Sequence, residues 1–154
     1  RSRLMDFRCW TTIPIMPGGQ HVARLVKDHP NYVFYSAELD RWLLKVPGNA
    51  LQFDEDLSTF WIEHVADTHG EGPAELAEPP PGRSLVYVAE VDQMLSLGLT
   101  VKHTPDRTVR RGCAHTSFFR SEDLDKPGRK ALSTDIAMLM ECVSGEPTPP
   151  PPGA

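Results

Sequence analysis

The residue types best suited to binding chemistry gather in one stretch of the chain, residues 102–130. This stretch holds half of the 16 lysine and arginine residues. Forked guanidinium donors, a glycine that allows close backbone approach and short hydroxyl side chains together suit a phosphate or carboxylate. The alternative is a solvated hairpin turn whose arginines balance acidic residues elsewhere. The candidate residues for binding an anion or a protein partner are Arg110, Arg111, His115, Thr116, Ser117 and Arg120.

Acidic residues concentrate in an earlier stretch, residues 54–92, where Arg83 is the one basic residue. Such segregation of charge is typical of a surface that meets a charged partner. The whole chain has a formal net charge of -5 and a pI of about 5.6. Because phosphate contacts along a nucleic acid need a basic domain, these values argue against a nucleic-acid partner. We therefore expect any electrostatic role to be local.

Serine, cysteine and histidine side chains in the same stretch could form a hydrolase site. Ser117 lies two residues after His115, and Cys113 lies near His103, so either pair could act as nucleophile and base if a third group oriented the histidine. A metal is not expected, because Cys113 and His115 would supply two ligands from one side of a strand, whereas structural zinc takes four. The remaining interpretation of Cys113 is a buried free thiol.

Length and composition predict one domain followed by a tail. A chain of 154 residues that is 40% hydrophobic can build one core but not two. We place the globular domain at residues 1–145 and a proline-rich linker or tail at residues 146–154, since a run of prolines can join neither a helix nor a central strand. A linker to another module is the first interpretation of the tail, and a ligand for an aromatic groove is the alternative.

The cysteines and the hydropathy pattern bear on location. The 3 cysteines form no Cys-x-x-Cys pair, and their odd number favours a reducing compartment, cytoplasmic at the site of action. No apolar run approaches the ~20 residues that span a bilayer, so no membrane segment is expected, and the first residues lack the apolar core of a signal peptide. Because the chain begins with Arg1 and not with Met, we expect a fragment, a processed product or an excised domain.

Residue patterns predict a mixture of strands and helices. Aromatic and β-branched runs predict strands over residues 6–13, 32–35, 84–91 and 114–119, the last two in one sheet. Apolar spacing and capping residues predict helices over 20–28, 36–46, from 54 or 56 to 65, and from 133 or 134 to 143. The helix over 36–46 would bury Leu39, Trp42, Leu43 and Val46, and residues 70–82 would form an exposed connector. This order predicts an α+β fold, a single compact domain with a mixed, mostly antiparallel sheet and three to four helices.

Three short segments resemble the skeleton of the ADP-ribosyltransferase toxins. Residues 6–8 (DFR) resemble that family's arginine on its first strand, after an aromatic or aliphatic residue. Residues 32–36 (YVFYS), before a helix-like segment, are similar in layout to its serine at the end of a second strand, although the family often has Ser-Thr-Ser there. Residues 118–122 (FFRSE) resemble the strand end that carries its glutamate, although many members have Glu or Gln where Arg120 stands.

The resemblance implies a bacterial effector that transfers ADP-ribose from NAD to a target protein. Arg8 and Ser36 would bind NAD and Glu122 would be catalytic. Residues 114–119 (AHTSFF) also resemble a His-Ser-Ser-Phe segment in C-terminal modules of bacterial secreted toxins, which implies that the effector could be secreted. Two other hypotheses stay open. One is a non-enzymatic domain that binds an acidic or phosphorylated protein through a basic face, and the other is a hydrolase that uses Ser117 and His115.

Overall fold

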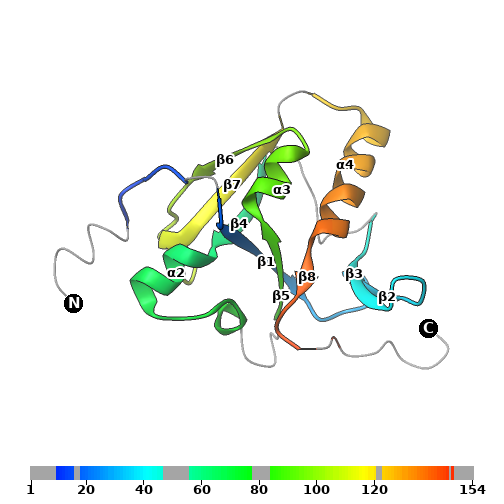
Figure 1. Ribbon diagram of the computed structural model, residues 1–154, viewed down its shortest axis with the longest axis horizontal. Coiled ribbons are helices and arrows are strands. Elements are labelled where there is room, and N and C mark those ends of the chain that lie inside the picture. Colours follow the sequence, from blue (N-terminus) through cyan, green and yellow to red (C-terminus); the bar gives the residue numbers. More distant parts are fainter. Residues whose placement is uncertain are drawn as a thin grey trace.

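The structure is a computed structural model that describes residues 10–15, 18–46, 56–77, 84–120, 123–145 and 147. Its strands are β1 (His21–Lys27), β2 (Val33–Ser36), β3 (Arg41–Leu44), β4 (Asp56–Trp61), β5 (Ser84–Glu90), β6 (Leu99–His103), β7 (His115–Arg120) and β8 (Glu141–Cys142). Six of them form one sheet in the order β6-β7-β4-β1-β5-β8, and β2 and β3 form a separate hairpin (Figure 1). Every strand pair within the described ranges is antiparallel.

Helices cover both faces of the six-stranded sheet. They are α2 (Ile62–His69), α3 (Val91–Ser96) and α4 (Lys126–Leu139), with 3-10 turns η2 (Pro73–Leu76) and η3 (Gly112–Ala114). Figure 1 shows α3 and α4 side by side, and their apolar residues belong to the larger core cluster. Residues Val65 of α2 and Leu76 of η2 belong to a second cluster. This arrangement confirms the predicted α+β fold.

The strand β1 replaces the helix predicted over residues 20–28, so that prediction was wrong. Val22 and Val26 lie in the larger cluster, whereas Ala23 lies in the second one with Leu25 packed against it. Successive side chains of a strand point to opposite faces. Since both faces of this central strand are covered, apolar residues occur on both, and their spacing imitates that of a helix.

The β2–β3 hairpin replaces the helix predicted over residues 36–46, so that prediction was also wrong. The Ser36 hydroxyl does accept a hydrogen bond from the Leu39 backbone N–H at 3.2 Å, as an N-cap would. Here it closes a turn, in which Asp40 adopts the left-handed conformation with φ 50°. The strands then pair Tyr35 with Trp42, and Leu39 is left 44% exposed.

Two further helix predictions have wrong boundaries. The segment from residue 54 or 56 to residue 65 is not one helix, because residues 56–61 form β4 with every second residue buried, and α2 begins only at Ile62. The last helix begins at Lys126, well before residue 133. There the Asp125 carboxylate accepts a hydrogen bond from the Gly128 N–H at 2.8 Å, and Pro127 fits the first turn. Its expected end is taken by β8, which pairs with β5.

Several strand predictions agree with the structure. The runs at 84–91 and 114–119 match β5 and β7 in the same sheet, and 32–35 overlaps β2.

Two other predictions differ from the structure. In the described part of 6–13, which begins at Trp10, no strand occurs, and the rest lies outside the described residues. The expected connector at 70–82 contains η2, whose Leu76 is buried at 2% exposure.

Truncating two leucines of the hairpin separates the observed strands from the predicted helix. Leu44 is 1% exposed in the core and Leu39 is exposed at the turn. We expect Leu44→Ala to lower the free energy of unfolding by about 2–5 kcal/mol. The control Leu39→Ala should change it by less than about 0.5 kcal/mol, as for most surface positions. Urea unfolding would measure both, and a larger loss for Leu39→Ala would contradict the hairpin.

Candidate functional site

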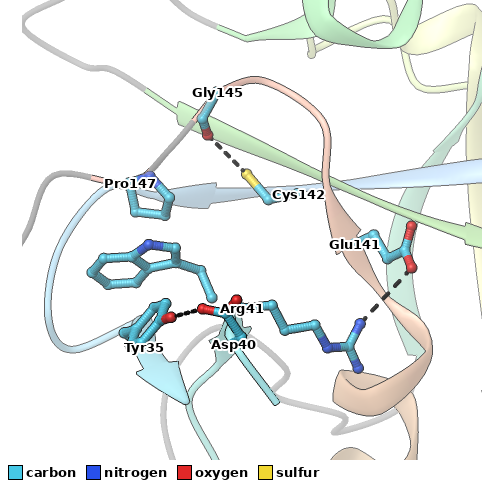
Figure 2. A pocket seen from close by; sticks show the side chains of 8 residues that line it. Tyr35, Asp40, Arg41, Glu141, Cys142, Gly145 and Pro147 are labelled. Carbon is cyan, nitrogen blue, oxygen red and sulfur yellow. Dashed lines mark hydrogen bonds and ion pairs between the residues drawn. The ribbon is translucent and has the colours of Figure 1, made fainter. Parts of the chain in front are cut away.

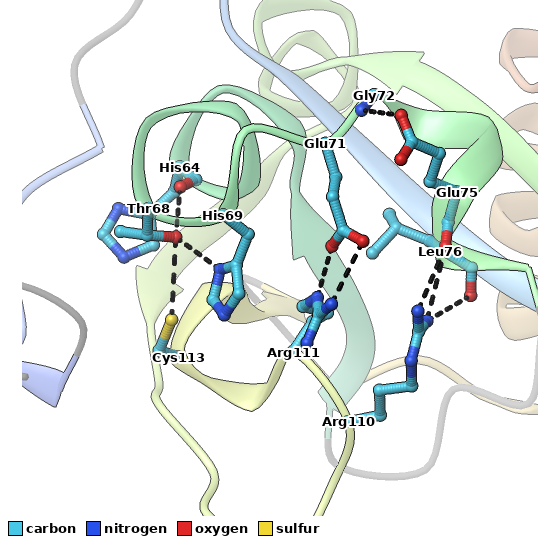
Figure 3. Close-up of polar contacts among 10 residues, drawn as sticks. All are labelled: His64, Thr68, His69, Glu71, Gly72, Glu75, Leu76, Arg110, Arg111 and Cys113. Atoms are coloured by element: carbon cyan, nitrogen blue, oxygen red, sulfur yellow. Dashed lines mark hydrogen bonds and ion pairs between the residues drawn. The ribbon is translucent and has the colours of Figure 1, made fainter. Parts of the chain in front are cut away.

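The two neighbouring arginines of the basic stretch contact the chain itself. Arg111 forms a two-pronged ion pair with Glu71 just after α2, its Nη2 donating to Oε2 at 3.0 Å. The hydrogen bonds from Arg111 lower the pKa of the Glu71 carboxyl. Arg110 is exposed and donates to the carbonyl oxygens of Glu75 and Leu76 at 3.4 Å (Figure 3). Both guanidinium groups therefore hold the loop before η3 against the segment after α2.

Gly112 allows the same loop to fold tightly. Its carbonyl accepts a hydrogen bond from the Asp106 N–H at 2.8 Å. A Cβ at position 112 would lie 1.6 Å from the Asp106 carbonyl oxygen, so no larger residue fits without moving the backbone. The glycine thus does provide the close approach that the sequence suggested, but the group it approaches is the chain's own backbone.

The candidate residues on β7 point to both faces of the sheet. Thr116 is fully buried, and its hydroxyl lies 2.6 Å from that of Thr59 on β4. His115 and Ser117 alternate with Thr116 along the strand and therefore point to the other face. Between them lies Thr104, whose Oγ1 is 2.8 Å from Ser117 Oγ and 3.0 Å from His115 Nδ1. Ser117 is only 3% exposed, so this arrangement offers a substrate no accessible nucleophile.

The remaining predicted site residues do not gather around that group. Arg120 ends β7, at the opposite end of the strand from the loop of Arg110 and Arg111. Ser36 lies in the hairpin turn, where its hydroxyl caps Leu39. Arg8 and Glu122, expected beside Ser36 at NAD, lie outside the described residues. The structure therefore does not test whether Arg8, Ser36 and Glu122, the three residues of the ADP-ribosyltransferase resemblance, lie in one site.

A buried histidine is fixed beside η3. His103 Nδ1 accepts a hydrogen bond from the Ile13 N–H at 3.1 Å, so its Nε2 carries the proton and donates to the Cys113 carbonyl at 2.6 Å. Both ring nitrogens thus have partners in the neutral form. The His103 ring packs edge to face against Trp61 and against His64, with ring centroids 5.6 Å and 5.0 Å apart, respectively. Burial, above all, lowers the pKa of His103.

Cys113 is disulfide-bonded, so its interpretation as a free thiol was wrong. Its bonding partner lies outside the described residues, and Cys142 is free. Among the residues that the structure describes, no group of three or more histidine, cysteine, aspartate or glutamate side chains could hold a metal ion.

A pocket of about 600 Å³ lies between the β2–β3 hairpin and the segment that runs from β8 to Pro147. We call it the aromatic pocket, since Tyr35 and Trp42 meet in its wall edge to face, with ring centroids 5.7 Å apart. Tyr35 is 47% exposed. Figure 2 shows Tyr35 and Pro147 on one side of the pocket and Glu141 on the other. The lining residues are Tyr35, Asp40, Arg41, Trp42, Glu141, Cys142, Gly145 and Pro147.

Polar contacts hold the walls of this pocket in place. The Tyr35 hydroxyl donates to the Asp40 carboxylate across the hairpin. Arg41 Nη2 donates to the Met138 carbonyl at the end of α4, at 2.8 Å, and Nη1 lies 4.0 Å from Glu141. The buried Tyr87 hydroxyl donates to the Trp42 carbonyl at 3.3 Å, and burial raises the pKa of Tyr87. The hairpin is thereby joined to α4, β8 and β5.

Sequence reasoning did not find the aromatic pocket. Trp42 was assigned to the buried stripe of a helix, and Tyr35 to a strand without a site. The one available signal was the proline-rich tail, for which an aromatic groove was the alternative interpretation. Pro147, which that interpretation placed in the tail, is buried in the structure and lines the pocket.

Comparisons with known proteins leave the pocket to be interpreted on its own geometry. No protein-family model, curated protein or solved structure matches the chain. None of the helices in the described ranges is both long and apolar enough to cross a bilayer.

The lowered pKa of His103 predicts a loss of stability in mild acid. The unfolded chain takes up a proton near the ordinary value of 6.5, whereas the folded chain does so only at lower pH. The free energy of unfolding should therefore fall as pH drops below about 6.5 and through the lowered pKa. His103→Gln, which keeps one acceptor and one donor, should reduce this fall. Unfolding measured from pH 8 to pH 4 tests this, with the exposed His29→Gln as control, and equal pH dependence in all three proteins would contradict it.

The disulfide at Cys113 predicts the number of reactive thiols. The chain has 3 cysteines, and Cys142 is free. Protein denatured without reductant should react with one equivalent of a maleimide, and the labelled peptide should contain Cys142. Reduction beforehand should raise the label to three equivalents, read by intact mass. Three labels without reduction would exclude the disulfide.

Proposed function

We propose that this chain is a protein-interaction domain that binds a peptide segment of a partner protein in the aromatic pocket. The observation that carries the proposal is the half-exposed Tyr35–Trp42 pair in an open pocket beside Arg41. Tyrosine, tryptophan and arginine are the residues most enriched at the energetic centres of protein interfaces. The volume, about 600 Å³, suits several side chains of a ligand.

The shape of the opposite wall favours a peptide over a small molecule. That wall consists of β8 and the irregular chain after it, where the Cys142 thiol donates to the Gly145 carbonyl at 3.2 Å and Pro147 is buried. A stretch of chain without regular secondary structure therefore already lines the pocket together with the aromatic residues. Charged groups on both sides, Asp40 on the hairpin and Glu141 on β8, can select the residues that flank an apolar anchor.

The basic stretch supports the interaction proposal less well than the pocket does. Arg111 is engaged by Glu71, and a partner would have to compete with that carboxylate. Arg110 has weaker contacts at 3.4 Å and is the more available of the two. A grip on an acidic or phosphorylated partner through Arg110, Arg111 and Arg120 is thus not the geometry that we favour.

The two enzymatic hypotheses stay predictions. Transfer of ADP-ribose from NAD by Arg8, Ser36 and Glu122 depends on two residues outside the described ranges. Hydrolysis by Ser117 and His115 would need the buried Ser117 hydroxyl to become accessible. Neither has a described observation in its favour.

The disulfide bears on where such a domain would work. Disulfides persist in oxidising environments and are rare in the cytosol. We therefore infer that the chain acts in an oxidising environment after export, and not in the reducing cytoplasm that the odd number of cysteines favoured. The bonded state of Cys113 supports this inference.

Selection from a random peptide display library on the immobilised chain tests the proposed function. We expect enriched peptides whose affinity falls at least about tenfold in Tyr35→Ala, the loss typical of an aromatic anchor. Phe34→Ala is the matched control, because Phe34 is 42% exposed on the same strand and points to the other face. Peptides that bind Tyr35→Ala as well as the unaltered chain, or no enrichment at all, would overturn the proposal.

A further inference from the structure

A proline of this chain already occupies one side of the aromatic pocket. Pro147 is buried and lines the pocket together with Tyr35 and Trp42 (Figure 2). The sequence continues from it with Thr148 and four consecutive prolines, residues 149–152. The described structure thus places Pro147, the last described residue before this proline run, in an aromatic site.

Proline-rich chain and aromatic grooves are chemically complementary. Proline fixes φ near −65°, so a run of prolines is already extended as polyproline II and loses little entropy on binding. Aromatic-lined grooves recognise such segments through the flat faces of the pyrrolidine rings. Since the pocket keeps about 600 Å³ beside Pro147, it has room for more than that single ring.

Covalent attachment gives the tail a large advantage over free ligands. A segment tethered one or two residues from its site experiences an effective concentration in the millimolar range. Even a weak proline site, with a dissociation constant near 0.1 mM, would then be occupied roughly nine-tenths of the time or more.

We propose that the aromatic pocket is a proline-recognition site whose resident occupant is the chain's own tail, from Pro147 to Pro152. The inference rests on the proposed function, because it concerns the same pocket, and it adds a ligand class and a built-in competitor. A partner's segment must displace the tail to bind.

Cys142 supplies a reporter of occupancy that needs no partner. Its thiol is free and lines the same pocket. An occupied pocket restricts access of a reagent to this sulfur. We would measure the rate of alkylation of native Cys142 by iodoacetamide in the full chain and in a variant with residues 149–152 changed from proline to serine, which retains the buried Pro147.

The serine variant should react roughly tenfold faster, in line with a site mostly closed by a tethered ligand. Adding a synthetic peptide with the sequence of residues 145–154 should slow the reaction again, and the same peptide with serine for proline should not. Both proteins should react equally fast when denatured, which controls for intrinsic reactivity of the thiol.

Two results would overturn the inference. One is an equal rate of Cys142 alkylation in the native full chain and the native serine variant. The other is a proline peptide that does not slow Cys142 alkylation in the serine variant. Neither result affects the outcome of the library selection. Enriched peptides that bind Tyr35→Ala more weakly would still support a peptide-binding pocket. Conversely, protection of Cys142 by the tail without any enriched peptide would support the tail as occupant while the proposed partner function fails.

Discussion

The pairing of β1 with strands on both of its sides is the constraint on which the rest of the structure depends. All seven residues of β1 are in register with β5, and Val22 and Ala23 also pair with β4. With both edges bonded and both faces covered, β1 joins the half of the sheet that ends in β6 to the half that ends in β8. The pocket depends on this order, because β5 positions β8, and the buried Tyr87 of β5 bonds to the hairpin that carries Trp42.

The sequence predicts strands well where β-branched and aromatic residues are concentrated. Both β5 and β7 are rich in β-branched and aromatic residues, so both were found. In β1 the burial of both faces removes the alternation, and the pattern no longer distinguishes strand from helix. In the hairpin, the capping hydrogen bond of Ser36 is real, but tertiary contacts decide that it closes a turn.

The candidate site was less predictable than the fold, for a physical reason. Charged side chains are easily recognised in a sequence. Whether they can bind a ligand depends on ion-pair partners that lie far away along the chain. Arg111 is engaged by Glu71, 40 residues away. The aromatic pocket has the same origin, since Tyr35 and Trp42 line it together with Cys142 of β8, a strand far along the chain. No local pattern encodes that meeting.

The loop beside η3 and the β2–β3 hairpin differ in how many of their side chains contact the rest of the chain. Beside η3, an ion pair, a backbone contact at Gly112, the neutral His103 and a disulfide all restrain one loop. A loop held by so many independent contacts has little freedom to close on a ligand, and its Arg111 is already paired with Glu71. The hairpin stands on the other side of the molecule from α2 (Figure 1) and exposes Phe34, Tyr35 and Leu39 at its end. Exposed apolar surface that lies together is typical of a binding site, and this is why we place the proposed partner segment at this end and not at the basic stretch.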